Sequence, residues 1–122
     1  MSHVHTGVDL IEISRVEAVV RRYSERFLNR VFTPQEQADA GGRAGSLAAR
    51  FAAKEAAAKA LGCGIGPVGW LDLEITRDSQ RRPELVLHGA ARRRAQELGL
   101  REWSVSLSHS KDYAIALVVA IG

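Results

Sequence analysis

Several features that mark other protein classes are scarce in this sequence, and each absence narrows what the chain can be. One of its 122 residues is a cysteine, Cys63, so an intramolecular disulfide is impossible, and no His/Cys spacing typical of zinc sites occurs. There is no run of about 18 apolar residues, and no basic segment followed by an apolar stretch at the N-terminus. We therefore expect neither membrane insertion nor export, and a cytoplasmic, reducing location.

The length allows one compact core and no second one, so we expect a single domain over residues 1–122. The content of 46% hydrophobic and 25% charged residues is typical of folded globular domains and excludes disorder. A chain of this size buries only about two thirds of its unfolded surface, so burial between subunits would add appreciably to its stability.

The charge is mildly basic. Lys and Arg number 17 against 14 Asp and Glu, a net charge of +3 that suits acidic proteins, nucleic acids and phosphate-rich ligands alike. The run Arg92-Arg93-Arg94 favours a nucleic-acid-binding protein as an alternative. Against it, aromatic residues make up only 6% of the chain, and no strand interleaves aromatic and basic residues. Phosphate-loop, dinucleotide-fold and G-x-S-x-G patterns are missing as well.

Periodicity and end signals predict alternating blocks of helix and strand. A β-prone run at 6–13 precedes an amphipathic basic helix at 15–27, for which Ser14 is the expected N-cap. The sequence TPQE at 33–36 is typical of a capping box, and the alanine-rich segment 46–61 is the strongest helix, closed by Gly62. Strands follow at 70–76 and 84–88, a helix at 89–98, and strands at 103–109 and 113–121. This order predicts an α+β domain with an antiparallel sheet packed against a long central helix.

One carboxylate stands at an unusual position. Asp9 lies inside an apolar strand, where aspartate is depleted and costly to bury unpaired. An edge-strand position or a local salt bridge explains it as well as a metal site does.

A second carboxylate, Glu55, stands in the alanine-rich helix at four-residue spacing from Phe51 and Lys59, so the three share one face, beside a second row of Arg50 and Lys54. The pattern is typical of a surface ion-pair ladder, although the surrounding alanines would let a ligand approach closely. Two such separated carboxylates could share one magnesium ion with phosphate oxygens.

The strand at 103–109 carries a histidine at its end. Its serines, Ser108 among them, face one way, while His109 ends the opposite, apolar row. A lone histidine there is more often structural than catalytic, and the serines are also typical of exposed strand positions.

Three segments together resemble the holo-acyl-carrier-protein synthases. They are GVDLIEI at 7–13, ARFAAKEAAAKALG at 49–62 and VSLSH at 105–109. The resemblance spans nearly the whole chain and implies a small, single-domain phosphopantetheinyl transferase, which forms trimers with active sites between subunits.

The resemblance also implies roles for individual residues. Magnesium is held by Asp9 and Glu55, the catalytic residues are Glu55, Lys59 and His109, and the residues around coenzyme A are Arg50, Phe51, Lys59, Gly62, Ser108 and His109. The position of Arg15 faces an acidic acyl carrier protein, and the basic helix adds Arg22 and Arg26, which follow Arg15 at spacings of seven and four. As a charge run, these arginines are equally typical of a solvated face.

The implied reaction is in-line attack of a carrier serine hydroxyl on the β-phosphate of coenzyme A, which releases adenosine 3′,5′-bisphosphate. Magnesium would bridge the pyrophosphate and Lys59 would offset charge on the leaving group. The general base is open between Glu55 and His109, and the choice between a fatty-acid and a polyketide carrier is open too.

The chain departs from the family at two places. Arg81-Arg82-Pro83 replaces a Gly-Lys-Pro turn at the nucleotide, and Ser110 follows His109 where many members have an acid. A scaffold that has lost its chemistry is a further alternative, against which Asp9, Glu55 and Lys59 argue.

Overall fold

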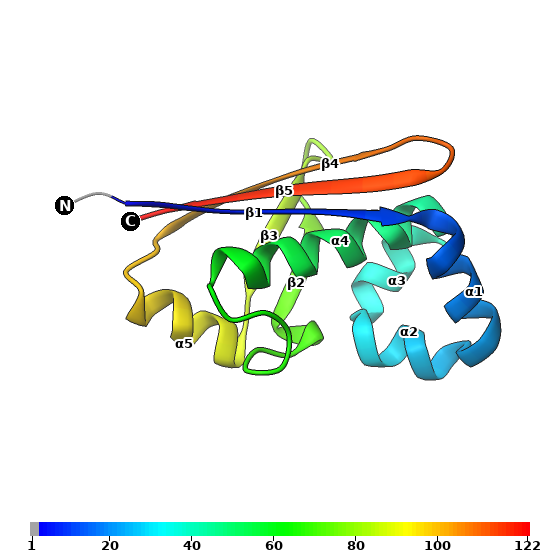
Figure 1. Cartoon of the computed structure of the whole chain (residues 1–122), viewed down its shortest axis with the longest axis horizontal. Coiled ribbons are helices and arrows are strands. Elements are labelled where there is room, and N and C mark those ends of the chain that lie inside the picture. Colours follow the sequence, from blue (N-terminus) through cyan, green and yellow to red (C-terminus); the bar gives the residue numbers. More distant parts are fainter. Residues whose placement is uncertain (1–2) are drawn as a thin grey trace.

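The computed structural model describes residues 3–122 as two antiparallel sheets and a set of helices (Figure 1). In chain order the elements are β1 (Val4–Glu12), α1 (Ile13–Tyr23), α2 (Glu25–Val31), α3 (Pro34–Ala40), α4 (Ala44–Ala60), the 3₁₀ turn η1 (Trp70–Asp72), β2 (Leu73–Arg77), β3 (Pro83–Leu87), α5 (Gly89–Glu97), β4 (Glu102–His109) and β5 (Tyr113–Ile121). The predicted α+β class is confirmed.

The larger sheet has the order β1-β5-β4, with β5 antiparallel to both neighbours. Its register pairs Asp9 with Ala116, and Ala116 with Leu107. Side chains of β5 alternate between buried and exposed, so Ala114, Ala116, Val118 and Ala120 face inward. Figure 1 shows the helices gathered on this one side of the sheet. The opposite face carries exposed apolar side chains.

Helix α4 packs on the inner face of the sheet through small residues. Ala52, Ala53, Ala56, Ala57 and Ala60 are fully or almost fully buried. The approach is closest at Gly7 of β1, where an added Cβ would overlap the carbonyl oxygen of Ala56 and lie 3.1 Å from the amide nitrogen of Ala60. Only glycine leaves enough room for the two backbones at this point.

The helix predicted at 15–27 is two helices, and this prediction was wrong. Tyr23 ends α1 and Glu25 begins α2, because Ser24 between them has φ 49° and ψ −124°, which no helix contains. Ser14 lies inside α1 and is not its N-cap. The strand runs directly into the helix, and the Ile13 amide donates to the carbonyl of Asp112 at 2.9 Å.

The predicted strand at 70–76 begins three residues late, at Leu73, and pairs with β3 in a sheet of its own. The carbonyls of Trp70 and Leu73 both accept from the Lys54 ammonium, at 3.0 and 2.8 Å, and this holds the segment between them in a tight turn. Of the helices in residues 3–122, none combines the length and apolarity needed to cross a bilayer.

Candidate active site

Asp9 lies on the inward face of β1 beside helix α4. Its side chain is 15% exposed and its Oδ1 lies 3.1 Å from Nζ of Lys59, which is itself 53% exposed. The same ammonium donates to the carbonyl of Val8 at 3.0 Å. Strand β1 therefore fixes the position of the Lys59 ammonium. The local salt bridge that was one explanation for Asp9 is present, and Lys59 is the partner.

Glu55 lies on α4 one turn before Lys59, half-buried. Burial raises the pKa of Glu55, the nearby Asp9 carboxylate raises it further, and Lys59 opposes both effects. The two carboxylates thus lie close enough to repel each other, and the half-exposed Lys59 ammonium supplies one positive charge to the two of them.

This donor set fits a hard divalent cation. In residues 3–122, no group of three or more His, Cys, Asp or Glu side chains is arranged to enclose a metal. A cation at Asp9 and Glu55 would therefore draw its remaining ligands from water and substrate, which is the usual coordination of magnesium beside phosphates.

A pocket of about 380 Å³ opens beside the two carboxylates. Its walls are Asp9, Leu10, Ile11, Arg15, Val16, Val19, Phe27, Phe51 and Glu55. The ring of Phe51 stacks on Trp70, with centroids 4.8 Å apart, and this fixes one wall. Most of the lining is apolar, with Arg15 on the α1 side and the two carboxylates at one end, so the pocket can take an apolar group that leads to a reacting phosphate.

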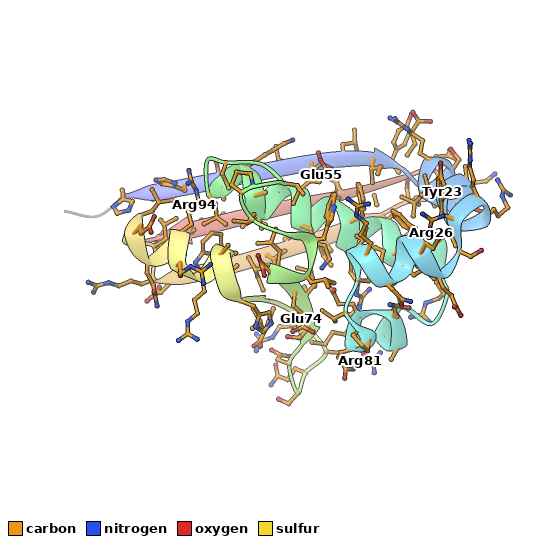
Figure 2. The ribbon with its side chains drawn as sticks, turned by 90° about the horizontal axis from the view of Figure 1, so that it is seen from below. Tyr23, Arg26, Glu55, Glu74, Arg81 and Arg94 are labelled. Carbon is orange, nitrogen blue, oxygen red and sulfur yellow. The ribbon has the colours of Figure 1, made fainter. Side chains whose placement is uncertain are left out.

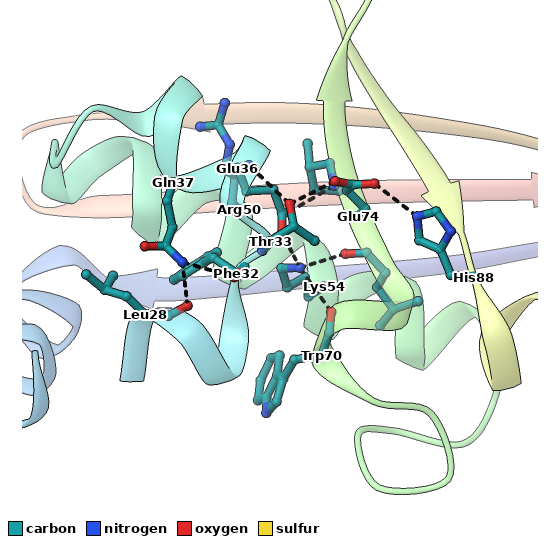
Figure 3. Close-up of polar contacts among 12 residues, drawn as sticks. Leu28, Phe32, Thr33, Glu36, Gln37, Arg50, Lys54, Trp70, Glu74 and His88 are labelled. Carbon is teal, nitrogen blue, oxygen red and sulfur yellow. Dashed lines mark hydrogen bonds and ion pairs between the residues drawn. The ribbon is translucent and has the colours of Figure 1, made fainter. Parts of the chain in front are cut away.

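The second row of α4 is buried, contrary to its interpretation as a surface ladder. Lys54 is fully buried and donates to Oε1 of Glu36 at 2.7 Å (Figure 3). The Glu36 carboxylate also accepts from the Thr33 and Ile75 amides, both at 2.9 Å. Burial lowers the pKa of Lys54, and Glu36 opposes that shift. Lys54 therefore joins α3, α4 and β2, and does not enter the candidate site.

Arg50, also buried, has a different surrounding. Its Nη1 donates to Oγ of Ser46 at 2.6 Å, while Nε and Nη2 have no hydrogen-bond partner in the described part of the chain. Burial lowers its pKa and nearby Arg77 lowers it further. Together with Arg77 and His109, Arg50 lines a pocket of about 170 Å³. A buried arginine with two unsatisfied nitrogens, close to a second arginine, favours binding of an anion in this pocket. Sequence patterns had not indicated Arg77.

His109 packs across Gly45 of α4, where an added Cβ would come within 3.1 Å of the imidazole ring. Ser108, one residue earlier, is exposed on the opposite face of β4, as the strand alternation predicts. Within one chain, His109 and Arg50 line a pocket that shares no residue with the one lined by Asp9 and Glu55. The structure thus places Asp9, Phe51, Glu55 and Lys59 together and Arg50 with His109 elsewhere, while Ser108 and Gly62 line neither pocket.

The arginines predicted to dock a carrier do not share one helix. Arg15 borders the pocket at Asp9, and the Arg22 guanidinium lies over the Tyr23 ring at 5.3 Å. Arg26 lies on α2, beyond the break at Ser24. The four-residue spacing therefore does not place Arg22 and Arg26 on one helix face. Figure 2 shows Tyr23 and Arg26 at one end of the molecule and Glu55 nearer its middle.

Comparison with known proteins identifies the family of this chain. Residues 5–118 match the family model described as the 4′-phosphopantetheinyl transferase superfamily. The chain is 55% identical to the holo-[acyl-carrier-protein] synthase of Herpetosiphon aurantiacus, over 96% of this chain and 98% of that protein. The corresponding enzyme of Moorella thermoacetica is 51% identical, over 95% and 92%.

Solved structures of similar proteins have the same fold. The holo-[acyl-carrier-protein] synthase of Helicobacter pylori, in complex with coenzyme A, superposes with a TM-score of 0.87 at 34% identity, over 94% of this chain and 98% of that one. A Bacillus anthracis synthase in complex with CoA (3′,5′-ADP) gives 0.81 at 34%, over 100% and 99%. The resemblance seen in the three sequence segments is confirmed: the chain belongs to the 4′-phosphopantetheinyl transferase superfamily.

Proposed function

We propose that Asp9 and Glu55 hold the magnesium ion with which this enzyme transfers the 4′-phosphopantetheine group of coenzyme A to a serine of an apo acyl carrier protein. The observation that carries the assignment is the close carboxylate pair on β1 and α4, in which burial and Asp9 raise the pKa of Glu55 despite Lys59. When bound, magnesium supplies charge neutralisation to the pyrophosphate oxygens.

Three side chains of the protein are candidates for the remaining catalytic roles, which are stabilisation of the leaving group and removal of the serine proton. The carrier serine oxygen forms a bond to the β-phosphorus as the bond to the bridging oxygen breaks, and adenosine 3′,5′-bisphosphate leaves. The Lys59 ammonium, which donates to the Val8 carbonyl and to Asp9, would offset the negative charge that grows on that leaving group. Glu55 is our first candidate to accept the serine proton because it lies in this site. His109, the second candidate, lines a different pocket of the same chain.

A trimer would bring the two pockets together. The outer face of the larger sheet exposes apolar side chains that range from 40% to 63% exposed, and a surface of this kind indicates a contact with another chain. They are Val4, Val8, Leu10, Ile115, Leu117 and Ile121. We propose that subunits associate through this face and that His109 of one subunit completes the site at Asp9 and Glu55 of the next.

Coenzyme A would then span both pockets. The unpaired Nε and Nη2 of Arg50, with Arg77 and His109, suit a phosphate group of the nucleotide half. The diphosphate would lie at Asp9, Glu55 and Lys59 of the neighbour. The free thiol of Cys63 is compatible with the cytoplasmic location that we predict.

The carrier would dock at the opposite end of the site. Arg15 borders the apolar pocket, and Arg26 lines a neighbouring groove with Tyr23 and Arg30. An acidic carrier helix with an apolar side chain at its centre fits this arrangement of basic rim and apolar pocket. We expect Arg15→Glu or Arg22→Glu to raise KM for the carrier far more than KM for coenzyme A. Added salt should weaken carrier binding to the wild-type enzyme more than to these variants.

The metal assignment is tested by coenzyme A binding and turnover with and without magnesium. Asp9→Asn and Glu55→Gln should lose the magnesium-dependent thermal stabilisation by coenzyme A, and with it the transfer of phosphopantetheine mass to an apo carrier. Glu12→Gln, an exposed acid at the end of the same strand, is the matched control. Unchanged magnesium dependence in both site variants would exclude these ligands.

The shared site is tested by mixing subunits. His109→Ala and Glu55→Gln are each expected to be inactive, and a mixture allowed to exchange subunits should regain activity. No recovery after demonstrated exchange, or a fully active monomer in light scattering, would exclude a site formed between subunits.

A further inference from the structure

The C-terminal end of α4 is closed by side chains from two other elements. Backbone amides of Gly62 and Gly64 turn back to the carbonyls of Lys59 and Ala58, at 2.9 and 3.3 Å. The next carbonyls along the chain bind side chains instead. Nδ1 of His5 lies 2.9 Å from the Ala60 oxygen, and Nε of Arg94 donates to the Leu61 oxygen at 2.7 Å.

Two site residues lie just before this end of α4. Glu55 and Lys59 are four residues apart on one face of the helix, and Gly62 follows in the turn two residues after the helix ends at Ala60. Gly62 has φ 73° and bears no side chain, and a Cβ there would lie 3.9 Å from Nη2 of Arg94. Within residues 3–122, no hydrogen bond engages Nη1 or Nη2 of Arg94. Figure 2 shows Arg94 and Arg26 on opposite sides of Glu55.

The local charge around Gly62 determines whether an anion can bind at this end of α4. The last turn of a helix exposes carbonyl oxygens and carries partial negative charge, which repels an anion. A diphosphate that extends from Asp9 and Glu55 past Lys59 would meet this turn over the bare backbone of Gly62. A guanidinium bound to the Leu61 carbonyl reverses the sign of the local charge while its outer nitrogens stay available.

We propose that Arg94 is a positioning residue for the diphosphate of coenzyme A: it fixes the turn after α4 through Leu61 and places a second positive charge beyond Lys59. This rests on the proposed placement of the diphosphate at Asp9, Glu55 and Lys59. Nothing in the alanine-rich helix predicts it, because the residue comes from α5.

The test compares Arg94→Ala, Arg94→Lys and the control Arg93→Ala, which removes the same charge from an exposed neighbouring position. Arg94→Ala should raise KM for coenzyme A about tenfold, as expected for loss of one charged hydrogen bond. KM for the carrier should stay at the wild-type value. Arg94→Lys, which keeps the charge and a donor, should recover most of the loss. Faster amide exchange at Cys63 and Gly64 in Arg94→Ala would report the loosened turn directly.

Two results would overturn the proposal. One is a lowered melting temperature in Arg94→Ala with KM for coenzyme A unchanged, which would make Arg94 a helix cap alone. The other is an equal rise in KM from Arg93→Ala, which would make the effect one of general charge. Should Arg94→Ala fail to fold, Arg94→Gln, which can still donate to the Leu61 carbonyl but lacks the charge, decides: a raised KM for coenzyme A supports the proposal and an unchanged KM overturns it. The magnesium-dependent stabilisation of Glu55→Gln by coenzyme A is measured separately. Failure of the metal assignment is therefore distinguishable from failure of the proposal for Arg94.

Discussion

Replacement of Gly7 by alanine tests the closest contact in the fold. The added Cβ would overlap the Ala56 carbonyl oxygen and lie 2.8 Å from its carbonyl carbon, and both obstacles are backbone atoms that no rotamer change can move. Strand β1 and helix α4 must separate by roughly 1.5 Å before the added Cβ and that oxygen reach ordinary van der Waals contact.

That separation removes contacts along the whole alanine seam. Overpacking typically costs about 1–3 kcal/mol, and the cavities that open beside Ala56 and Ala60 add to it. We expect a loss of about 3 kcal/mol in the free energy of unfolding, which lowers the melting temperature by about 10 °C in a domain of this size. Gly69→Ala is the matched control, since a Cβ there makes only an ordinary contact, 3.6 Å from Oδ2 of Asp72.

The substitution should also impair the site. Gly7 is two residues from Asp9, and Ala56 follows Glu55, so movement at the seam pulls the two carboxylates apart. Thermal melts with coenzyme A should show weaker magnesium-dependent stabilisation in Gly7→Ala, at temperatures where circular dichroism shows it folded. A melting temperature within 1 °C of wild type would refute the reasoning about this contact.

Three further substitutions test other features. Ser24→Gly should stabilise the protein by about 1 kcal/mol in denaturant unfolding, because glycine relieves the positive φ; a loss of stability would contradict the strain. Lys54→Met should cost about 3–5 kcal/mol by leaving Glu36 buried without its partner, and adding Glu36→Leu should recover part of it; no recovery would contradict the pairing. Burial alone would raise the pKa of Glu74, but hydrogen bonds from His88 and Thr33 lower it overall. The ionised Glu74 therefore stabilises the fold above the ordinary glutamate pKa, and this stabilisation is lost as the pH falls through the lowered pKa of the folded state. Glu74→Gln should flatten this acid limb in melts across pH, and identical pH profiles would argue against it.

Local signals in the sequence predict most of the elements. The capping box at Thr33 and Glu36 is present as predicted, with Thr33 Oγ1 accepting from the Glu36 amide at 3.1 Å. The alanine-rich helix and the alternating strand β5 also lie where periodicity places them, because each pattern depends only on residues close in sequence.

What the sequence could not predict depends on contacts between distant segments. The break at Ser24 has no glycine or proline to mark it, and the start of α1 is set by Asp112, almost a hundred residues away. The separation of β2 and β3 into their own sheet is likewise a matter of pairing. At the site, helical spacing correctly predicted that Glu55 and Lys59 share one helix face. It could not predict that Lys54 is buried and paired with Glu36, because that contact joins distant segments.

The alanine content of α4 has a physical explanation in the geometry of the site. Asp9 is fixed to a strand and Glu55 to a helix, and a helix that packs on a sheet through large side chains would hold the two backbones further apart than short carboxylates can bridge. Alanines at the seam, and Gly7 opposite Ala56, bring β1 close enough for Lys59 of the helix to bind the Val8 carbonyl of the strand. The same small residues that limit the apolar area of the core therefore place two acids where one cation can meet both.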